Sequence, residues 1–284
     1  MKALVLGASG MLGNAMMRVL SEEEDWDVFG TVRSSEVARL FSPKIAERLV
    51  AGVDIGNHDT LTKLFAQVRP NVVVNCIGLV KQLAEADDPL MAIPINSLLP
   101  HRLAGLCDLV GARLVHISTD CVFAGKKGDY RESDPSDAED LYGKSKFLGE
   151  VDYPHAITLR TSIIGHELQG ARSLIDWFLS QERKCKGYTK AIYSGLPTVV
   201  LAQIVRDVVI PRTDLSGLYH VAAQPISKYD LLRLVADVYG KAIEIIPDDK
   251  LVIDRSLNAD RFRDATGYVA PGWPISIELM HSYR

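Results

Sequence analysis

A glycine-rich turn between a strand pattern and a helix pattern lies at the start of the chain. The apolar run 2–6 leads into Gly7, Gly10 and Gly13, and an amphipathic helical pattern follows at 11–21. Gly7 permits a tight turn, Gly10 lets a ligand approach the backbone, and Gly13 lets helix pack on strand. The N–H groups at such a helix start suit a pyrophosphate. The spacing therefore predicts a dinucleotide-binding turn, with a turn that binds nothing as the alternative.

Short apolar runs alternate with helical periodicity along the chain, which is typical of a parallel α/β sheet. The predicted strands are 2–6, 27–31, 48–51, 71–76, 112–117, 156–160 and 217–222. The predicted helices are 11–21, 58–68, 89–110, 141–151, 172–182, 198–210 and 227–239. We expect an α/β fold, a Rossmann-type doubly wound parallel sheet with a smaller C-terminal substrate-binding lobe. Residues 1–165 would form the dinucleotide-binding domain, to which about 195–225 would also belong. Residues 166–284 would mainly form the smaller lobe.

Composition excludes several classes of protein. A net charge of −4 gives no reason to expect nucleic-acid binding, which needs a basic face. The four cysteines lie far apart without a C-x-x-C pair, so we expect reduced thiols and a cytoplasmic protein. The histidines lack metal-ligand spacing, so no metal site is expected. We also expect no signal peptide and no membrane span, because the first apolar run is short and reads as a strand.

Polar or small residues lie at the end of four of the predicted strands or directly after it. They are Gly7, Asn75, Ser118 and Thr161. In open parallel sheets, ligands lie beyond the carboxyl ends of the strands, near the point where strand order reverses. We therefore expect these four strand ends to line one crevice.

Tyr142 and Lys146 are four residues apart on a predicted helix, so both side chains lie on one face. A nearby ammonium favours phenolate over phenol and is expected to lower the pKa of the tyrosine. Such a phenol can exchange a proton with a carbonyl or alcohol oxygen near neutral pH. The hydroxyl of Thr119 could hold the same oxygen, and a nicotinamide could deliver hydride to the carbonyl carbon.

These motifs together resemble the extended short-chain dehydrogenases/reductases, and among them the dTDP-4-dehydrorhamnose reductase group. That group combines G-x-x-G-x-x-G, S-T-D-Y-V-F-x-G, Y-G-K-x-K and R-T-S. This chain has the glycine turn, Ser118–Gly125, Tyr142–Lys146 and Arg160–Ser162. The resemblance spans 1–165 clearly and 215–284 loosely. Cys121 stands where the group has tyrosine, and 163–165 replace an aromatic-containing segment, which bears on substrate identity more than on reaction type.

The resemblance implies roles for individual residues. The catalytic residues would be Thr119, Tyr142 and Lys146. The cofactor-binding residues would be Gly7, Ser9, Gly10, Met11, Leu12, Gly13, Arg33, Asp54, Ile55, Cys76, Ile77, Gly78, Asn96, Ser118, Tyr142 and Lys146. The substrate-binding residues would be Thr119, Asp120, Cys121, Val122 and Arg255.

The segment 31–35 bears on cofactor choice, because an acidic residue there would bind a ribose 2′-hydroxyl and an arginine suits a 2′-phosphate. It carries no carboxylate and one arginine, Arg33. We predict that NADP(H) is preferred, with NAD(H) as a second option. The alternative is that Arg33 is only a solvated residue at a strand end.

The substrate side rests mainly on Arg255, because a guanidinium binds diphosphate through paired hydrogen bonds. Arg261 and Arg263 are weaker candidates. Trp177 and Trp273 could stack on a base or sugar, although core packing is the ordinary role of such residues.

The predicted function is NAD(P)H-dependent reduction of a nucleotide-linked 4-keto-6-deoxy sugar, in polysaccharide or related sugar biosynthesis. One alternative is a sugar-nucleotide epimerase or dehydratase, which would share the same three catalytic residues. Another is a non-catalytic NADP-binding regulatory subunit. A nucleotide sugar is the expected small-molecule partner. A homodimer is one oligomeric state that the sequence allows.

Overall fold

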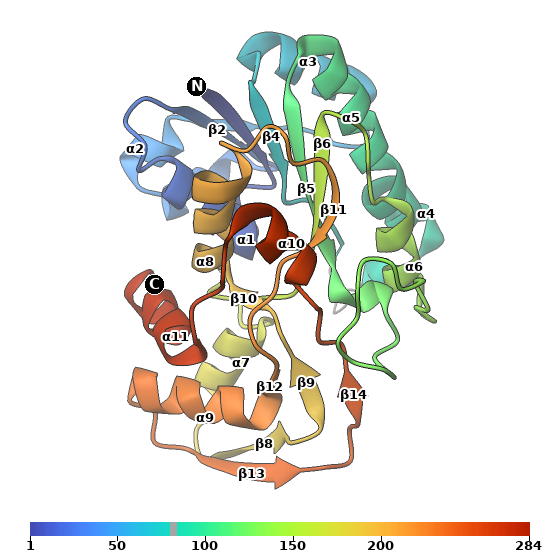
Figure 1. Cartoon of the computed structure of the whole chain (residues 1–284). Helices are drawn as coiled ribbons and strands as arrows, with labels where there is room; N and C mark the ends of the chain where they lie inside the picture. The colour runs from blue at the N-terminus through green and yellow to red at the C-terminus, as the bar shows by residue number, and fades with distance from the viewer. Residues whose placement is uncertain (80–83) are drawn as a thin grey trace.

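The protein is built on a central parallel sheet, described by a computed structural model that covers residues 1–79 and 84–284. The seven-stranded sheet has the order β11-β6-β5-β4-β1-β2-β3 (Figure 1). Its strands are β1 Lys2–Leu6, β2 Asp27–Val32, β3 Leu49–Ala51, β4 Val72–Asn75, β5 Arg113–Thr119, β6 Ala156–Thr161 and β11 Gly217–His220. Every pairing is parallel, and strand order reverses between β1 and β4. The predicted doubly wound sheet is confirmed.

Helices cover both faces of this sheet, which is why its strands read as nearly continuous apolar runs. Along β1, Ala3 and Val5 face the core that contains α1 and α8, whereas Leu4 and Leu6 face the core of α3 and α5. These helices and their neighbours are α1 Met11–Leu20, α2 Pro43–Ala46, α3 His58–Val68, α4 Pro89–Ala92, α5 Leu99–Val110, α6 Leu141–Leu148 and α8 Thr198–Ile204. Short 3₁₀ turns lie at Ser35–Leu40, Ala84–Asp87 and Asp120–Val122.

The helix predicted over 89–110 is interrupted. Its middle, Ile93–Leu98, is a π-helical turn between α4 and α5, with Pro94 near its start. Proline has no N–H to donate and its ring clashes with the preceding turn, so a regular α-helix cannot pass through it without adjustment. A second π turn, Val205–Val209, follows α8 within the predicted helix 198–210.

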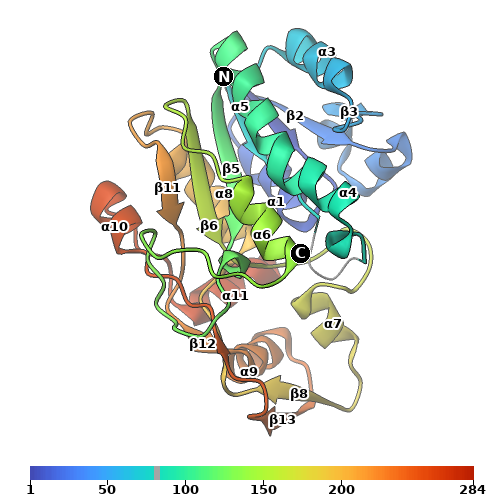
Figure 2. The same cartoon turned by 90° about the vertical axis from the view of Figure 1, so that its right-hand side faces the viewer.

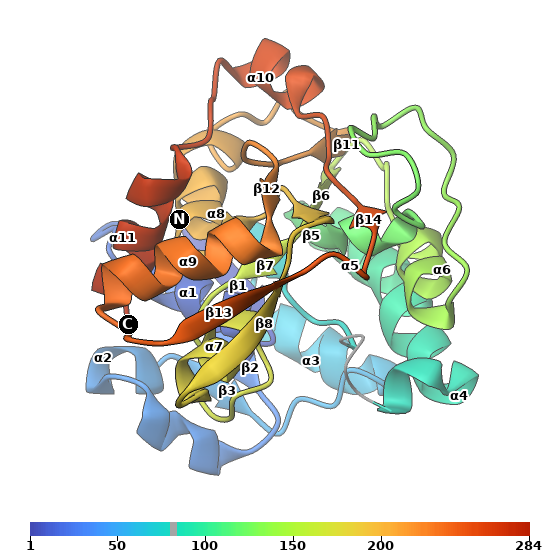
Figure 3. The same ribbon diagram turned by 90° about the horizontal axis from the view of Figure 1, so that it is seen from below.

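A lower lobe lies beneath the carboxyl edge of the sheet (Figures 1 and 3). It is assembled from short pairings, β8 with β13, β9 with β12 and β14, and β7 with β10. The remaining elements are β7 Ile163–Ile164, α7 Leu174–Ser180, β8 Lys184–Tyr188, β9 Ala191–Tyr193, β10 Leu196–Pro197, β12 Ile226–Ser227, α9 Lys228–Tyr239, β13 Glu244–Asp248, β14 Ile253–Asp254, α10 Asp260–Thr266 and α11 Trp273–Ser282. Sequence periodicity predicted α7 and α9 here but none of the strands of two to five residues.

Candidate active site

The glycine turn after β1 has the predicted strand–turn–helix form. Gly7 has φ +80°, and a Cβ on it would lie 2.9 Å from a side-chain carbon of Ile77. A Cβ on Gly13 would lie 2.0 Å from the Gly7 carbonyl oxygen, so only glycine lets α1 approach the turn this closely. Gly10 is exposed, and α1 begins after it without a side-chain cap. The N–H groups of the first turn of α1, from Met11 on, therefore have no side-chain cap, as a pyrophosphate site requires.

The residues predicted to bind the adenosine half of the cofactor follow β2 and β3. Arg33 is exposed, directly after β2. Ser34 accepts a hydrogen bond from the Glu36 N–H and so caps the next turn. Asp54 accepts from the Gly56 N–H with one oxygen, and the half-buried Ile55 packs against the second core. These strand ends leave the Arg33 guanidinium at the surface.

The loop after β4 passes under the glycine turn. Asn75 is buried, accepts from the Ile77 N–H and makes a 3.1 Å contact with Nδ1 of His116. Cys76 is half-buried beside Ile77, and burial raises the pKa of its thiol to about 12. Gly78 is exposed, and a Cβ on it would lie 3.7 Å from Nζ of Lys146. The loop thus brings Gly78 close to the predicted catalytic lysine.

Asn96 connects this loop to the catalytic helix. It lies in the π turn, is 1% exposed, and accepts from the Leu79 N–H at 2.9 Å. Its amide donates to Ser145 Oγ at 3.1 Å, and neighbouring Ser97 donates to the Ser145 carbonyl. The π turn aims both side chains at α6, which fixes α6 against the loop around Gly78.

Thr119 and Tyr142 are the two residues that the sequence predicts to take part in proton transfer. Thr119 ends β5, and its hydroxyl accepts from the Cys121 N–H at 3.1 Å. Burial raises the pKa of the Tyr142 phenol, and a hydrogen bond with Thr119 partly opposes that rise. The prediction that the pKa of Tyr142 is lowered is therefore wrong. Burial raises this pKa by more than the hydrogen bond with Thr119 lowers it. The phenol is protonated near neutral pH.

Lys146 lies on α6 and is 5% exposed. Its Nζ donates to the main-chain carbonyl of Ile117 on β5 at 2.9 Å. Burial lowers the pKa of the amine to about 8, and the charge of Glu150 opposes that shift. A buried ammonium beside an exposed glycine is suited to hold ribose hydroxyls at this point of the crevice.

Asp120, Cys121 and Arg255 are the residues predicted to contact the substrate. Asp120 is 8% exposed and accepts from the Thr119 hydroxyl at 3.2 Å. Burial raises the pKa of the Asp120 carboxyl, and the nearby charge of Arg255 lowers it. Cys121 lies close enough to Tyr142 to affect its pKa. Val122, by contrast, is fully buried in an apolar cluster, so its side chain supports the site from behind.

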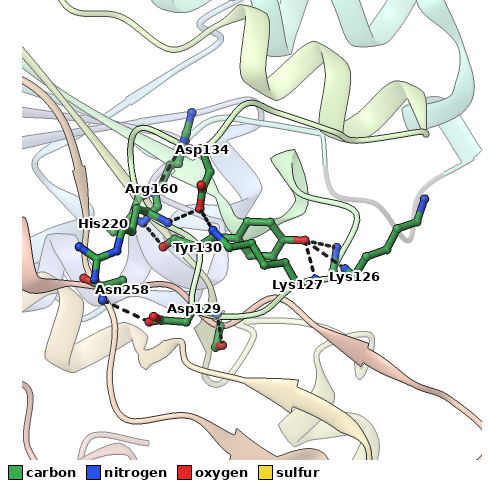
Figure 4. A network of polar contacts seen from close by, with 11 residues as sticks. Lys126, Lys127, Asp129, Tyr130, Asp134, Arg160, His220 and Asn258 are labelled. Atoms are coloured by element: carbon green, nitrogen blue, oxygen red, sulfur yellow. Dashed lines mark hydrogen bonds and ion pairs between the residues drawn. The ribbon is translucent and has the colours of Figure 1, made fainter.

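Arg255 is held near Asp120 by a tightly bonded loop. Its Nε donates to the Phe123 carbonyl, and the Asp254 N–H donates to the Gly125 carbonyl. The hydroxyl of Tyr130 accepts from three consecutive N–H groups, at residues 125–127 (Figure 4). The C-terminal segment that carries Arg255 is therefore fastened to the loop that follows Thr119.

The weaker candidates for substrate binding are two arginines and two tryptophans. Arg261 stacks over Tyr219, and Arg263 pairs with Asp260 at 2.8 Å. Trp273 is buried and donates to the Gln224 carbonyl, a core role. Trp177 is 38% exposed on α7.

A buried ion pair that the sequence did not predict lies beside the site. Ser118, predicted as a cofactor residue, donates its hydroxyl to Glu150 at 2.6 Å. The same carboxylate receives two hydrogen bonds from Arg160, at 2.7 and 2.6 Å. The position of Arg160 inside a buried strand is a sequence signal, because a buried charge needs a partner.

All four cysteines lie in the described part of the chain and none forms a disulfide. Over residues 1–79 and 84–284, no cluster of side chains has the composition of a metal site. Across these same two ranges, no helix has the length and apolar character needed to span a bilayer.

Residues 1–253 match the family described as the RmlD substrate binding domain. The chain belongs to this family. Its relatives include a probable low-salt glycan biosynthesis reductase of Haloferax volcanii, 29% identical over 93% of this chain and 87% of that one. The dTDP-4-dehydrorhamnose reductase of Salmonella typhimurium is 25% identical over 99% and 97% of the two chains. Among solved structures, the dTDP-4-dehydrorhamnose reductase of Bacillus anthracis in complex with NADP has a TM-score of 0.79 at 20% identity, over 100% and 99% of the chains. The resemblance to the dTDP-4-dehydrorhamnose reductase group that the motifs indicated is thus confirmed.

Proposed function

We propose that this chain is an NADPH-dependent reductase of a nucleotide-linked 4-keto-6-deoxy sugar, close in activity to dTDP-4-dehydrorhamnose reductases. Two observations carry the proposal: Thr119 is hydrogen-bonded with Tyr142, and Lys146, on the same helix as Tyr142, lies beside Gly78. The named reductases among the relatives support the same reaction.

The assay is oxidation of NADPH, followed at the reduced-nicotinamide absorbance band, with a panel of nucleotide-linked 4-ketosugars. A reductase consumes NADPH in proportion to product. An epimerase or dehydratase changes the sugar without net consumption, and a regulatory subunit leaves both unchanged. Either of the last two results would refute the proposal.

The catalytic roles follow from the protonation states. A bound reduced nicotinamide supplies the hydride that reduces the carbonyl carbon. Tyr142 donates its proton to the keto oxygen, and its raised pKa keeps that proton in place until the oxygen gains negative charge. Thr119 donates a hydrogen bond to the same oxygen, and Lys146 stabilises the phenolate left behind.

The proposed binding roles divide between the two halves of the crevice. The cofactor contacts would come from the glycine turn, the ends of β2, β3 and β4, and Asn96 acting through the loop it holds. Asp120, Cys121 and Arg255 would contact the nucleotide sugar, with the Arg255 guanidinium facing its diphosphate. We further propose a boundary near residue 165 between the dinucleotide-binding domain and the lower lobe, with 195–225 returned to the former.

Arg33→Asp tests the proposed preference for NADP(H). The aspartate repels a 2′-phosphate and can accept from a 2′-hydroxyl, so the KM for NADPH should rise by about tenfold or more while the KM for NADH changes little. Steady-state kinetics with both cofactors measure this, with Arg39→Asp on the following turn as the control. Equal changes for both cofactors would mean that Arg33 does not contact the phosphate.

We also propose a homodimer in a reducing, cytoplasmic setting, in keeping with four thiols. Helices α4, α5 and α6 lie on one face of the molecule (Figure 2). These helices and the π turn between α4 and α5 carry exposed apolar residues. They are Leu90, Leu98, Leu109, Phe147 and Leu148, exposed by 42–82%. Apolar residues gathered on one face are typical of a protein interface.

Leu98→Lys with Leu148→Lys should convert the dimer to a monomer in light scattering at micromolar concentration, because two charges per subunit would be buried. Val269→Lys, also at an exposed apolar residue but outside this face, should leave the mass unchanged. A monomeric unmodified protein would contradict the proposal.

A further inference from the structure

Tyr130 lies in the loop between β5 and α6, and its side chain holds that loop together from within. It is 3% exposed, and its hydroxyl accepts from the N–H groups of residues 125–127 at 3.0–3.2 Å (Figure 4). Its ring stacks on that of Phe123, with 4.1 Å between the centroids and 10° between the planes. The turn 123–130 is therefore fixed by one side chain, through both its ring and its hydroxyl.

The main chain around Tyr130 pairs with the C-terminal segment 254–258. The Tyr130 N–H donates to the Ser256 carbonyl at 2.9 Å, and the Asp129 N–H donates to Ser256 Oγ at 2.8 Å. The Tyr130 carbonyl accepts from the Asn258 N–H at 2.8 Å, and the Asn258 side chain donates to Asp129 (Figure 4). We call the turn and this segment together the clasp.

His220 on β11 anchors the clasp to the central sheet. Its Nδ1 lies 3.0 Å from the Tyr130 carbonyl, and its Nε2 lies 3.3 Å from Nη1 of Arg160 (Figure 4). A carbonyl only accepts, so Nδ1 carries the hydrogen and Nε2 accepts from the arginine. Burial and the charge of Arg160 lower the pKa of His220 to about 3, so the ring is neutral near neutral pH. The anchor therefore keeps the same pair of hydrogen bonds over the pH range in which the protein is assayed.

Arg255 lies in the middle of the segment that Tyr130 holds. Its Nε donates to the Phe123 carbonyl at 2.7 Å, and the Phe123 N–H donates to the Asp120 carbonyl at 3.0 Å. A Cβ on Gly125 would lie 2.9 Å from Cγ of Arg255, so the stem of the arginine lies against the turn. Within the part of the chain that the structure describes, the two terminal nitrogens of this guanidinium make no hydrogen bond or ion pair. That planar fork is left to bind a ligand.

We propose that Tyr130 is a positioning residue for the nucleotide sugar, because it holds the clasp that orients the Arg255 guanidinium toward the diphosphate. Tyr130 does not contact the ligand itself, since its hydroxyl is already bonded to three N–H groups and its ring is buried. The inference rests on the proposed function for the nature of the ligand. It adds a residue that sets the affinity for the diphosphate and leaves the chemical step alone.

Tyr130→Phe tests the proposal. Phenylalanine keeps the ring on Phe123 but leaves three N–H groups without their acceptor, so the turn no longer holds Arg255 in place. The affinities for dTDP and for UDP, measured by titration calorimetry without cofactor, should each fall by about fivefold or more. With a ketosugar, KM should rise by a similar factor while kcat stays within about threefold. The affinity for NADPH should not change.

A double-variant cycle separates positioning from general damage. Arg255→Met removes the guanidinium and should weaken the binding of both diphosphates by about tenfold or more. Adding Tyr130→Phe to it should change the affinity by less than about twofold, since the group that Tyr130 orients is gone. Tyr283→Phe is the matched control. It removes a tyrosine hydroxyl bonded to Glu22, outside the clasp, and should leave both affinities unchanged.

If Tyr130→Phe does not fold, Ser256→Ala decides, because it removes only the hydroxyl that accepts from the Asp129 N–H. Its affinity for the diphosphates should fall by about threefold, and only while Arg255 is present. Unchanged affinity in the folded variant, or an equal loss with and without Arg255, would overturn the proposal. Binding of neither dTDP nor UDP by the unmodified chain would do the same.

These titrations need neither NADPH nor a ketosugar. A chain that binds the diphosphates through Arg255 and Tyr130 but consumes no NADPH would refute the reductase function alone. A chain that reduces the ketosugar with an unchanged KM in Tyr130→Phe would refute the role of Tyr130 alone. The two failures are therefore distinguishable.

Discussion

Tyr142→Phe should lower kcat/KM by about 100-fold or more while the protein folds normally and binds NADPH. The phenol is protonated in the site, so removing its oxygen removes the proton donor, together with one hydrogen bond to Thr119, and leaves the aromatic ring in place. Turnover of the ketosugar at the reduced-nicotinamide band measures the loss, and a thermal melt confirms the fold.

Tyr188→Phe is the matched control, because this half-buried tyrosine lies on β8 in the lower lobe. Its turnover should equal that of the unmodified chain. If Tyr142→Phe also kept near-normal turnover, another group would be the acid and the proposed mechanism would have to be abandoned.

Gly13→Ala should have the largest effect on stability of the substitutions considered. The added methyl would lie 2.0 Å from the Gly7 oxygen and 2.9 Å from Cα of Ala8, and both are backbone atoms that cannot turn aside. Either α1 shifts or the turn opens, at a cost of about 3 kcal/mol or more. Urea denaturation measures the free energy of unfolding, and NADPH affinity should fall with it.

Gly105→Ala in α5 is the same change of glycine to alanine, but here we expect it to stabilise the protein. Nothing lies within 4 Å of the new methyl, and glycine inside a helix is less favourable than alanine. The free energy of unfolding should rise by about 0.5–1 kcal/mol. Similar losses in both variants would show that backbone crowding at the glycine turn is not the cause.

The central sheet could be predicted because its strands are buried on both faces. The runs 2–6, 71–76 and 112–117 are dense in apolar or β-branched residues, and the observed strands begin and end within two residues of them. The lower lobe offered no such signal. Strands as short as Ile226–Ser227 are set by tertiary pairing, which a periodicity of a few residues cannot encode.

The sequence predicted those parts of the site whose residues belong to one short motif. The spacing of Tyr142 and Lys146 placed both on α6, and the strand ends placed Thr119 beside them. The pKa of Tyr142 could not be predicted, because its sign depends on burial. Glu150 reads as an ordinary surface residue until the partner strand brings Arg160 to it.

The chain crosses between its two halves several times. β9 pairs with β12 and β14, yet β11, which lies between β9 and β12 in the chain, belongs to the central sheet. A chimera that exchanges substrate specificity with a relative therefore cannot be made by one junction near residue 165. At least two stretches must be transplanted together, on either side of β11, or the grafted strands would arrive without their partners.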